Sequence, residues 1–246
     1  MARLRTAEGL RIGAFAGAPV ILDWSVALLV AYLLAIDISR NGIAGAPFAI
    51  AYAIALLVSI LAHELAHAQV AAWFNLPSKA IVLTFFGGHV EFVRPPLKRW
   101  HDILVSAAGP LANLAIWAAC QGAAPLLAGG GDSAPPDNPI PELAGGFLGD
   151  LALLNLLLGA FNLLPGYPLD GGRMAQAALS YVIPRAAARR VAAWGGLIIA
   201  IGVAIFGLSR GLLLSVGIAY LLARAAWTEI VVATRLLRAG LAPSQP

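Results

Sequence analysis

Long apolar stretches separated by short polar or Gly/Pro-rich breaks dominate this chain. Several approach or reach the roughly 20 residues that a helix needs to cross a hydrocarbon core about 30 Å thick. The pattern predicts an all-α polytopic membrane protein with about six transmembrane helices. The expected spans are residues 24–40, 46–73, 102–125, 145–165, 190–208 and 211–234. The first span is short, and the last is interrupted by Arg224 and Glu229.

A different pattern interrupts the helical series at residues 79–93. Two short β-prone runs flank Gly87 and Gly88, which predicts a small membrane-associated β-hairpin. A hairpin at membrane depth is tolerated only where it lines a polar cavity or packs on protein. One interpretation is that its free edge, around Phe86, Gly87 and Gly88, pairs with an extended substrate. The other is a plain cytoplasmic hairpin, and the sequence leaves both open.

Composition and charge agree with a membrane protein. Of 246 residues, 60% are apolar and 11% are charged. The net charge of +4 comes from basic residues in the segments between spans, so it indicates topology and no nucleic-acid partner. Residues 126–144 contain acids but no base and are expected to form a flexible outer loop over 128–142. This asymmetry predicts a multi-pass cell-membrane protein with both termini cytoplasmic. The first residues contain no clean apolar core followed by a small-residue cleavage site before Asp23, so no removed signal peptide is expected.

Cys120 is the single cysteine of the chain and lies in an apolar segment. An internal disulfide is therefore excluded, and so is a zinc site built from thiolates. Any metal site must use histidine and carboxylate side chains.

The strongest candidate for such a site is His63-Glu64-Leu65-Ala66-His67, inside the 46–73 span. Residues four apart share one face of a helix, so both imidazoles can bind one Zn²⁺ while Glu64 reaches a neighbouring water molecule. The alternative is that all three are satisfied core residues. That alternative is disfavoured in a membrane helix, where ionisable groups cost several kcal/mol unless they pair or bind something.

Two histidines leave a zinc site incomplete, and Asp170 is the candidate third ligand. It follows Pro165 and Pro168, which must break the helix, and precedes two glycines that permit tight turns. In the expected topology the second and fourth spans run in the same direction. The candidate ligands His63, His67 and Asp170 then all lie toward the cytoplasmic side. The alternative is an ordinary carboxylate at a helix end.

These two motifs together resemble the paired signatures of the site-2 protease family of intramembrane metalloproteases. The family pattern is H-E-x-x-H followed by N-x-x-P-x-x-P-x-D-G, and every defined position matches within residues 63–67 and 162–171. The likeness also includes Phe86-Gly87-Gly88 and residues 108–113, and it covers about residues 15–175. One departure is Asp23, where many members have histidine. The resemblance implies one Zn²⁺ per chain on His63, His67 and Asp170, and Glu64 as general base.

Two asparagines extend the candidate site. The resemblance implies that Asn162 lies close to the active site. Asn113 is an amide in an apolar helix, which needs hydrogen-bond partners and is expected to face the interior near the active site. With Phe86, Gly87 and Gly88, both are candidates for substrate binding. His89 and His101 have no partner at ligand spacing and are expected to be surface or interfacial residues.

The function expected from these residues is that of a zinc metalloendopeptidase. It would cleave peptide bonds in or near the transmembrane segment of single-span membrane proteins in the lipid bilayer. A metal transporter or sensor is the alternative, and a serine protease is disfavoured because no matching Ser/His pairing appears. Residues 1–246 are expected to form one domain, with a catalytic core at about 46–175 and accessory helices at about 190–234. The sequence leaves a homo-oligomer open.

Overall fold

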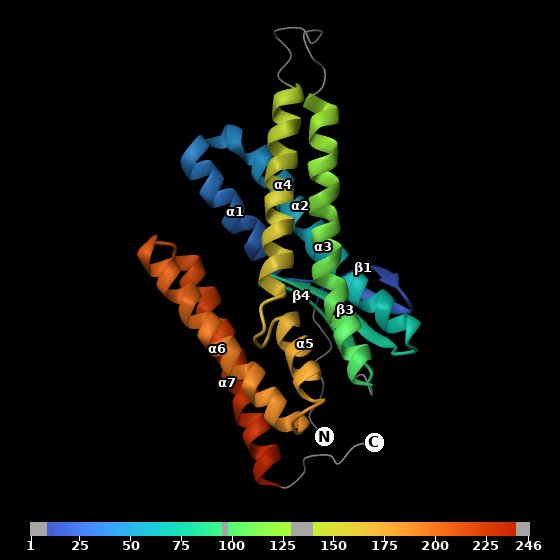
Figure 1. Cartoon of the computed structure of the whole chain (residues 1–246). Coiled ribbons are helices and arrows are strands. Elements are labelled where there is room, and N and C mark those ends of the chain that lie inside the picture. The colour runs from blue at the N-terminus through green and yellow to red at the C-terminus, as the bar shows by residue number, and fades with distance from the viewer. Residues whose placement is uncertain (1–8, 95–97, 129–139, 240–246) are drawn as a thin grey trace. The chain divides into compact units, whose positions relative to one another are not determined.

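The computed structural model describes residues 9–94, 98–128 and 140–239 (Figure 1). The chain divides into two compact units. One contains Met1–Arg94 with Leu111–Gly159, and the other contains Pro95–Pro110 with Ala160–Pro246. Most of the outer loop predicted at 128–142 lies outside the described residues.

Helices make up most of the described chain, as the sequence predicts. They are α1 (Val26–Asn41), α2 (Ala46–Trp73), α3 (Arg99–Ala128), α4 (Ile140–Asn162), α5 (Asp170–Leu179), α6 (Arg185–Ser209) and α7 (Leu213–Arg238). Among the described residues, five helical segments are long and apolar enough to cross a membrane: Ile43–Trp73, Arg99–Ala123, Gly145–Asn162, Arg185–Ser209 and Leu213–Arg238. The first predicted span corresponds to α1, whose 16 residues fall short of the roughly 20 that spanning requires.

The predicted hairpin is present, but it is half of a larger sheet. The four strands are β1 (Gly9–Phe15), β2 (Ala18–Asp23), β3 (Ser78–Thr84) and β4 (Gly87–Phe92). Their order is β1-β2-β3-β4, with antiparallel β1/β2 and β3/β4 pairs. β2 runs parallel to β3, with Val20 opposite Ile81. That pairing joins segments some sixty residues apart in the sequence, so no local sequence pattern predicts it.

The sheet packs on the part of α2 that carries the histidine motif. Ala68 of α2 forms a fully buried cluster with Ala18, Val20 and Ile81, and Leu61 and Leu65 pack beside it. In a second cluster, Ile60 of α2 packs with Val26 of α1 and Leu83 of β3. Burial of these apolar side chains fixes the rotation of α2 about its axis. The polar face that bears His63 and His67 is thereby set in place.

In the second unit, α6 and α7 form a helical hairpin and α5 packs on α6 (Figure 1). Small residues line the buried side of these helices, which lets the backbones approach closely. The buried alanines include Ala186, Ala188, Ala192, Ala193, Ala226 and Ala233. Arg189 of α6 also donates a hydrogen bond to the carboxylate of Glu229 in α7, so a charge on each helix is paired.

Candidate metal centre

α2 presents His63 and His67 one turn apart on a single face. Their ring centroids are 4.7 Å apart and the rings meet edge to face at 81°. Both side chains are buried, as is Glu64 between them with 5% of its surface exposed. A helical step of about 100° per residue puts Glu64 beside the face of α2 that carries the two histidines.

Asp170 lies in the first turn of α5, where the helix N-terminus favours a negative charge. The loop before it is folded back tightly on the helix start. A Cβ at Gly171 would overlap the carbonyl of Leu163, and one at Gly172 would overlap the backbone of Gly166. Glycine is therefore needed at both positions after Asp170, because any side chain there would overlap the backbone of the preceding loop.

Tyr167 anchors the same loop from both sides. Its backbone N–H donates to the carbonyl of Ala192 in α6 at 3.1 Å. Its hydroxyl donates to Oε1 of Gln176 in α5 at 2.6 Å. Burial raises the pKa of the Tyr167 phenol to about 12, so the hydroxyl stays protonated and remains a donor at neutral pH.

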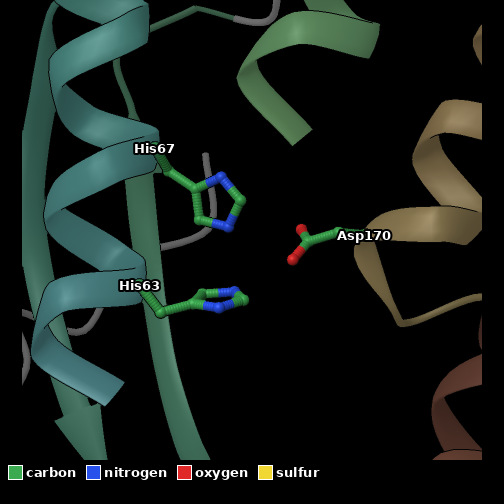
Figure 2. A group of neighbouring side chains, drawn as sticks. All are labelled: His63, His67 and Asp170. Atoms are coloured by element: carbon green, nitrogen blue, oxygen red, sulfur yellow. The ribbon is translucent and has the colours of Figure 1, made fainter. Parts of the chain in front are cut away.

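His63, His67 and Asp170 point toward one another (Figure 2). Each offers one ligand atom, and these atoms all lie within 4.8 Å of one another. Two imidazole nitrogens and one carboxylate oxygen are a zinc donor set that leaves the fourth tetrahedral position open, as in catalytic zinc sites. The chemistry of the residues therefore fits the expected zinc ion.

The start of β4 lies against Glu64. A Cβ added to Gly88 would stand 2.5 Å from Cγ and 2.8 Å from Oε1 of Glu64. Phe86, in the turn before β4, is 63% exposed. In the described sheet β4 pairs with a strand on one side only, with β3, so its other edge is open to a further strand.

Asn113 of α3 lies beside the first histidine. Its Oδ1 is 2.6 Å from Nδ1 of His63, and none of its surface is exposed. Asn155 of α4 bonds to Asn113 and to Ser59 of α2 and is equally buried. Neither Asn155 nor Ser59 is predicted from the sequence, although Asn155 carries the same signal as Asn113, an amide within an apolar helix.

The remaining candidate residues are Asn162, His89 and His101. Asn162 is the last residue of α4 and is half-buried, and its place at the active site remains a prediction. His89 is exposed, 3.9 Å from Glu91. His101 packs edge to face on Trp100. The predicted substrate contacts of Phe86, Gly87, Gly88 and Asn113 also remain predictions.

Comparisons with known proteins identify relatives of this chain. The model of peptidase family M50 matches residues 51–129 and 142–207. Rip3 of Mycobacterium tuberculosis is 34% identical over 254 residues, which covers 95% of this chain and 62% of Rip3. The zinc metalloprotease MJ0392 of Methanocaldococcus jannaschii is 29% identical over 199 residues, covering 81% of this chain and 54% of that protein. The chain thus spans less than two thirds of the length of these relatives.

A solved structure is similar over nearly the whole chain. The site-2 protease from Methanocaldococcus jannaschii superposes with a TM-score of 0.66 at 27% identity. The match covers 90% of this chain and 94% of that one. The chain therefore shares its fold of helices and sheet with a site-2 protease.

Proposed function

Because the chain belongs to peptidase family M50, the site-2 protease family, we propose that it is a multi-pass membrane zinc endopeptidase that cuts membrane-protein substrates. The observation that carries this proposal is the convergence of His63, His67 and Asp170 beside a buried carboxylate, Glu64. Three protein ligands with an open fourth position suit hydrolysis.

In this proposal His63, His67 and Asp170 hold the metal, and Glu64 is the general base. A zinc ion in this set supplies a Lewis acid that lowers the pKa of water and polarises a carbonyl group. Glu64 takes the proton of the attacking water and passes it to the leaving amine. Its burial favours this role, because few solvent molecules compete for its oxygens and the sheet limits its rotamers.

The proposed substrate is the transmembrane segment of a single-span protein, bound in an extended form. A helix hides its peptide bonds in internal hydrogen bonds, so the segment must unwind before hydrolysis. The free edge of β4 supports this, since an added strand there would recover the lost backbone hydrogen bonds. Gly88 at the start of β4 places that strand against Glu64. The active site is proposed to open toward the cytoplasm, as the loop charges indicate.

The experiment compares Glu64→Gln with wild-type protein in detergent or liposomes. Zinc per chain and cleavage of a co-expressed single-span substrate are measured on the same samples. The amide keeps the size of Glu64 but cannot act as a base, so zinc should stay bound while cleavage falls about 10²- to 10⁴-fold. Asp150→Asn is the matched control, because the amide oxygen can still accept the hydrogen bond from Tyr52.

Two results would defeat the proposal. One is wild-type protein that binds zinc yet cuts none of the single-span substrates tested. The other is a Glu64→Gln variant that cuts at the normal rate. A metal transporter with the same ligands predicts unchanged metal flux in Glu64→Gln and no proteolysis to lose, so the two functions separate in one experiment.

A further inference from the structure

A chain of buried polar side chains runs through the first unit, away from the proposed metal face of His63. It passes from His63 to Asn113 of α3, then to Asn155 of α4, and ends at Ser59, one turn before His63 on α2. Asn113 and Asn155 are 0% exposed and Ser59 is 2% exposed. Buried amides cost free energy unless their hydrogen bonds are made, so the order of donors and acceptors in this chain is constrained.

The order of donors and acceptors in this series of hydrogen bonds is fixed by backbone carbonyl groups at the end formed by Asn155 and Ser59. Nδ2 of Asn155 lies 2.9 Å from the carbonyl oxygen of Leu151, which can only accept. The same nitrogen lies 3.0 Å from Oγ of Ser59, whose own proton is donated to the carbonyl of Ala55 at 2.8 Å. Both hydrogens of the Asn155 amide are therefore used, and its Oδ1 must be the atom that faces Asn113.

The same logic orients Asn113. Its Nδ2 donates to Oδ1 of Asn155 at 2.8 Å and to the carbonyl oxygen of Ser59 at 3.2 Å. Its Oδ1 is therefore the atom 2.6 Å from Nδ1 of His63. An amide oxygen accepts and cannot donate, so Nδ1 of His63 must carry the hydrogen. The lone pair of the neutral ring is then on Nε2.

We propose that Asn113 and Asn155 are positioning residues that hold His63 in the Nδ1–H tautomer, with Nε2 as its metal-binding atom. Oδ1 of Asn113 accepts the hydrogen bond from Nδ1 of His63, and Asn155 fixes the orientation of the Asn113 amide. A reversed Asn113 would offer NH₂ to Nδ1 and leave the ring hydrogen on Nε2, where it blocks a metal. The inference rests on the proposed assignment of His63 as a zinc ligand, and it gives Asn113 a more specific role than substrate contact.

The first test is zinc affinity, measured by competition with a chelator. Loss of the hydrogen-bonding partner of a metal-binding histidine weakens metal binding about 10- to 100-fold, which is the loss expected for Asn113→Leu and Asn155→Leu. Ser59→Ala should cost less, because Leu151 still orients Asn155. Ser106→Ala is the control, since this hydroxyl of α3 is fully buried and makes no hydrogen bond.

The second test reads the tautomer directly in zinc-free protein. Nitrogen NMR of histidine-labelled protein distinguishes Nδ1–H from Nε2–H, and the chain has only 4 histidines to assign. His63→Gln identifies the resonances of His63. Wild type should show the Nδ1–H form, and Asn155→Leu should shift part of the population to Nε2–H. Asn113→Asp retains an acceptor opposite Nδ1, so it should keep the wild-type tautomer that Asn113→Leu loses.

An Asn155→Leu variant with the wild-type tautomer and wild-type zinc affinity would overturn the inference. So would an Nε2–H signal for His63 in the wild type. If the leucine variants do not fold, Asn113→Asp and Ser59→Ala carry the test, and loss of the Nδ1–H form in Asn113→Asp refutes it. Because the tautomer is read without metal or substrate, failure of the proposed protease activity would leave this measurement decisive.

Discussion

The two sources of metal ligands are held in place by different physical means. His63 is fixed by side-chain hydrogen bonds, through Asn113 and Asn155, within helices that are apolar around them. Asp170 is fixed by its backbone, at the junction of a loop with α5, where glycines at 166, 171 and 172 leave no space for a side chain. The first arrangement depends on the direction of hydrogen bonds and the second on volume.

This difference predicts opposite sensitivities. The histidine side should tolerate small changes of size but not the loss of a donor or acceptor, since a half-satisfied buried network is costly. The Asp170 side should tolerate changes in nearby charge but not an added methyl group, since backbone atoms cannot move aside as a flexible side chain can. Variants of each kind test this difference.

The largest effect is expected from Gly196→Val in α6. A Cβ at this position would overlap the carbonyl oxygen of Tyr167, so the loop before Asp170 must shift. Overpacking of this kind costs about 1–3 kcal/mol or more. Zinc per chain should fall to the low level expected of an Asp170→Ala variant, which lacks the proposed third ligand. Zinc content and thermal unfolding measure the two effects.

Gly202→Val is the matched control for that variant. It lies in the same helix and a Cβ there meets nothing within 4 Å, while the change in helix propensity is the same. Equal zinc contents in the two variants would show that close packing does not hold Asp170.

A smaller effect, confined to turnover, is expected from Gly88→Val in β4. The added Cβ would overlap Cγ of Glu64 and displace its carboxylate, but its nearest neighbours include none of the proposed zinc ligands, so zinc should remain bound. A displacement of about 1 Å at a catalytic group costs on the order of 10²-fold in rate. Gly13→Val in β1 is the control, because a Cβ there has open space. If Gly88→Val lost zinc together with activity, the added side chain would disturb the metal ligands as well as Glu64, which would contradict this prediction.

Much of this architecture could be predicted from the sequence because its signals are local. Apolar runs of spanning length predicted five helices that match, and a Gly-Gly pair between β-prone runs predicted the β3–β4 hairpin. The spacing of His63 and His67 is likewise a property of one helix. The zinc expected from those residues fits the cluster that they form with Asp170.

The features that could not be predicted depend on contacts between distant segments. β1 and β2 lack a long alternating pattern, and β2 is stabilised by pairing with Ile81 and its neighbours across a long separation. Asn155 and Ser59 become interpretable only when α2, α3 and α4 bring them together. The short helix α5 was missed because Pro165 and Pro168 indicate a break and say little about the conformation of the residues after it. The accessory role predicted for residues 190–234 remains a prediction, although Gly196 packs on the loop that precedes Asp170.

Asp102 supplies a third, weaker test of the comparison. Its buried carboxylate accepts from Arg173 at 3.5 Å and from Arg185 at 3.3 Å, linking α3, α5 and α6 by charge. Asp102→Asn should lower the free energy of unfolding by about 1–2 kcal/mol, because both guanidinium groups keep partial access to water. Zinc affinity should change little if Asp170 is held by backbone packing. A tenfold loss of zinc affinity would show that charge also positions it.

The smallest effect is expected on the sheet, at the exposed pair of Lys79 and Glu91. Their side chains lie 3.1 Å apart across β3 and β4 and are 41% and 32% exposed. Solvent-exposed ion pairs contribute about 0–1 kcal/mol and are screened by salt, so Lys79→Ala should shift thermal unfolding slightly and less at high ionic strength. The register of the hairpin is set instead by burial of Ile81 and Leu83 on one side of the sheet and Val82 on the other, all fully or nearly fully buried. Replacing Ile81 with Ala should therefore destabilise far more than Lys79→Ala, by about 2–5 kcal/mol. Comparable losses from both variants would mean that charge, and not burial, holds β4 beside Glu64.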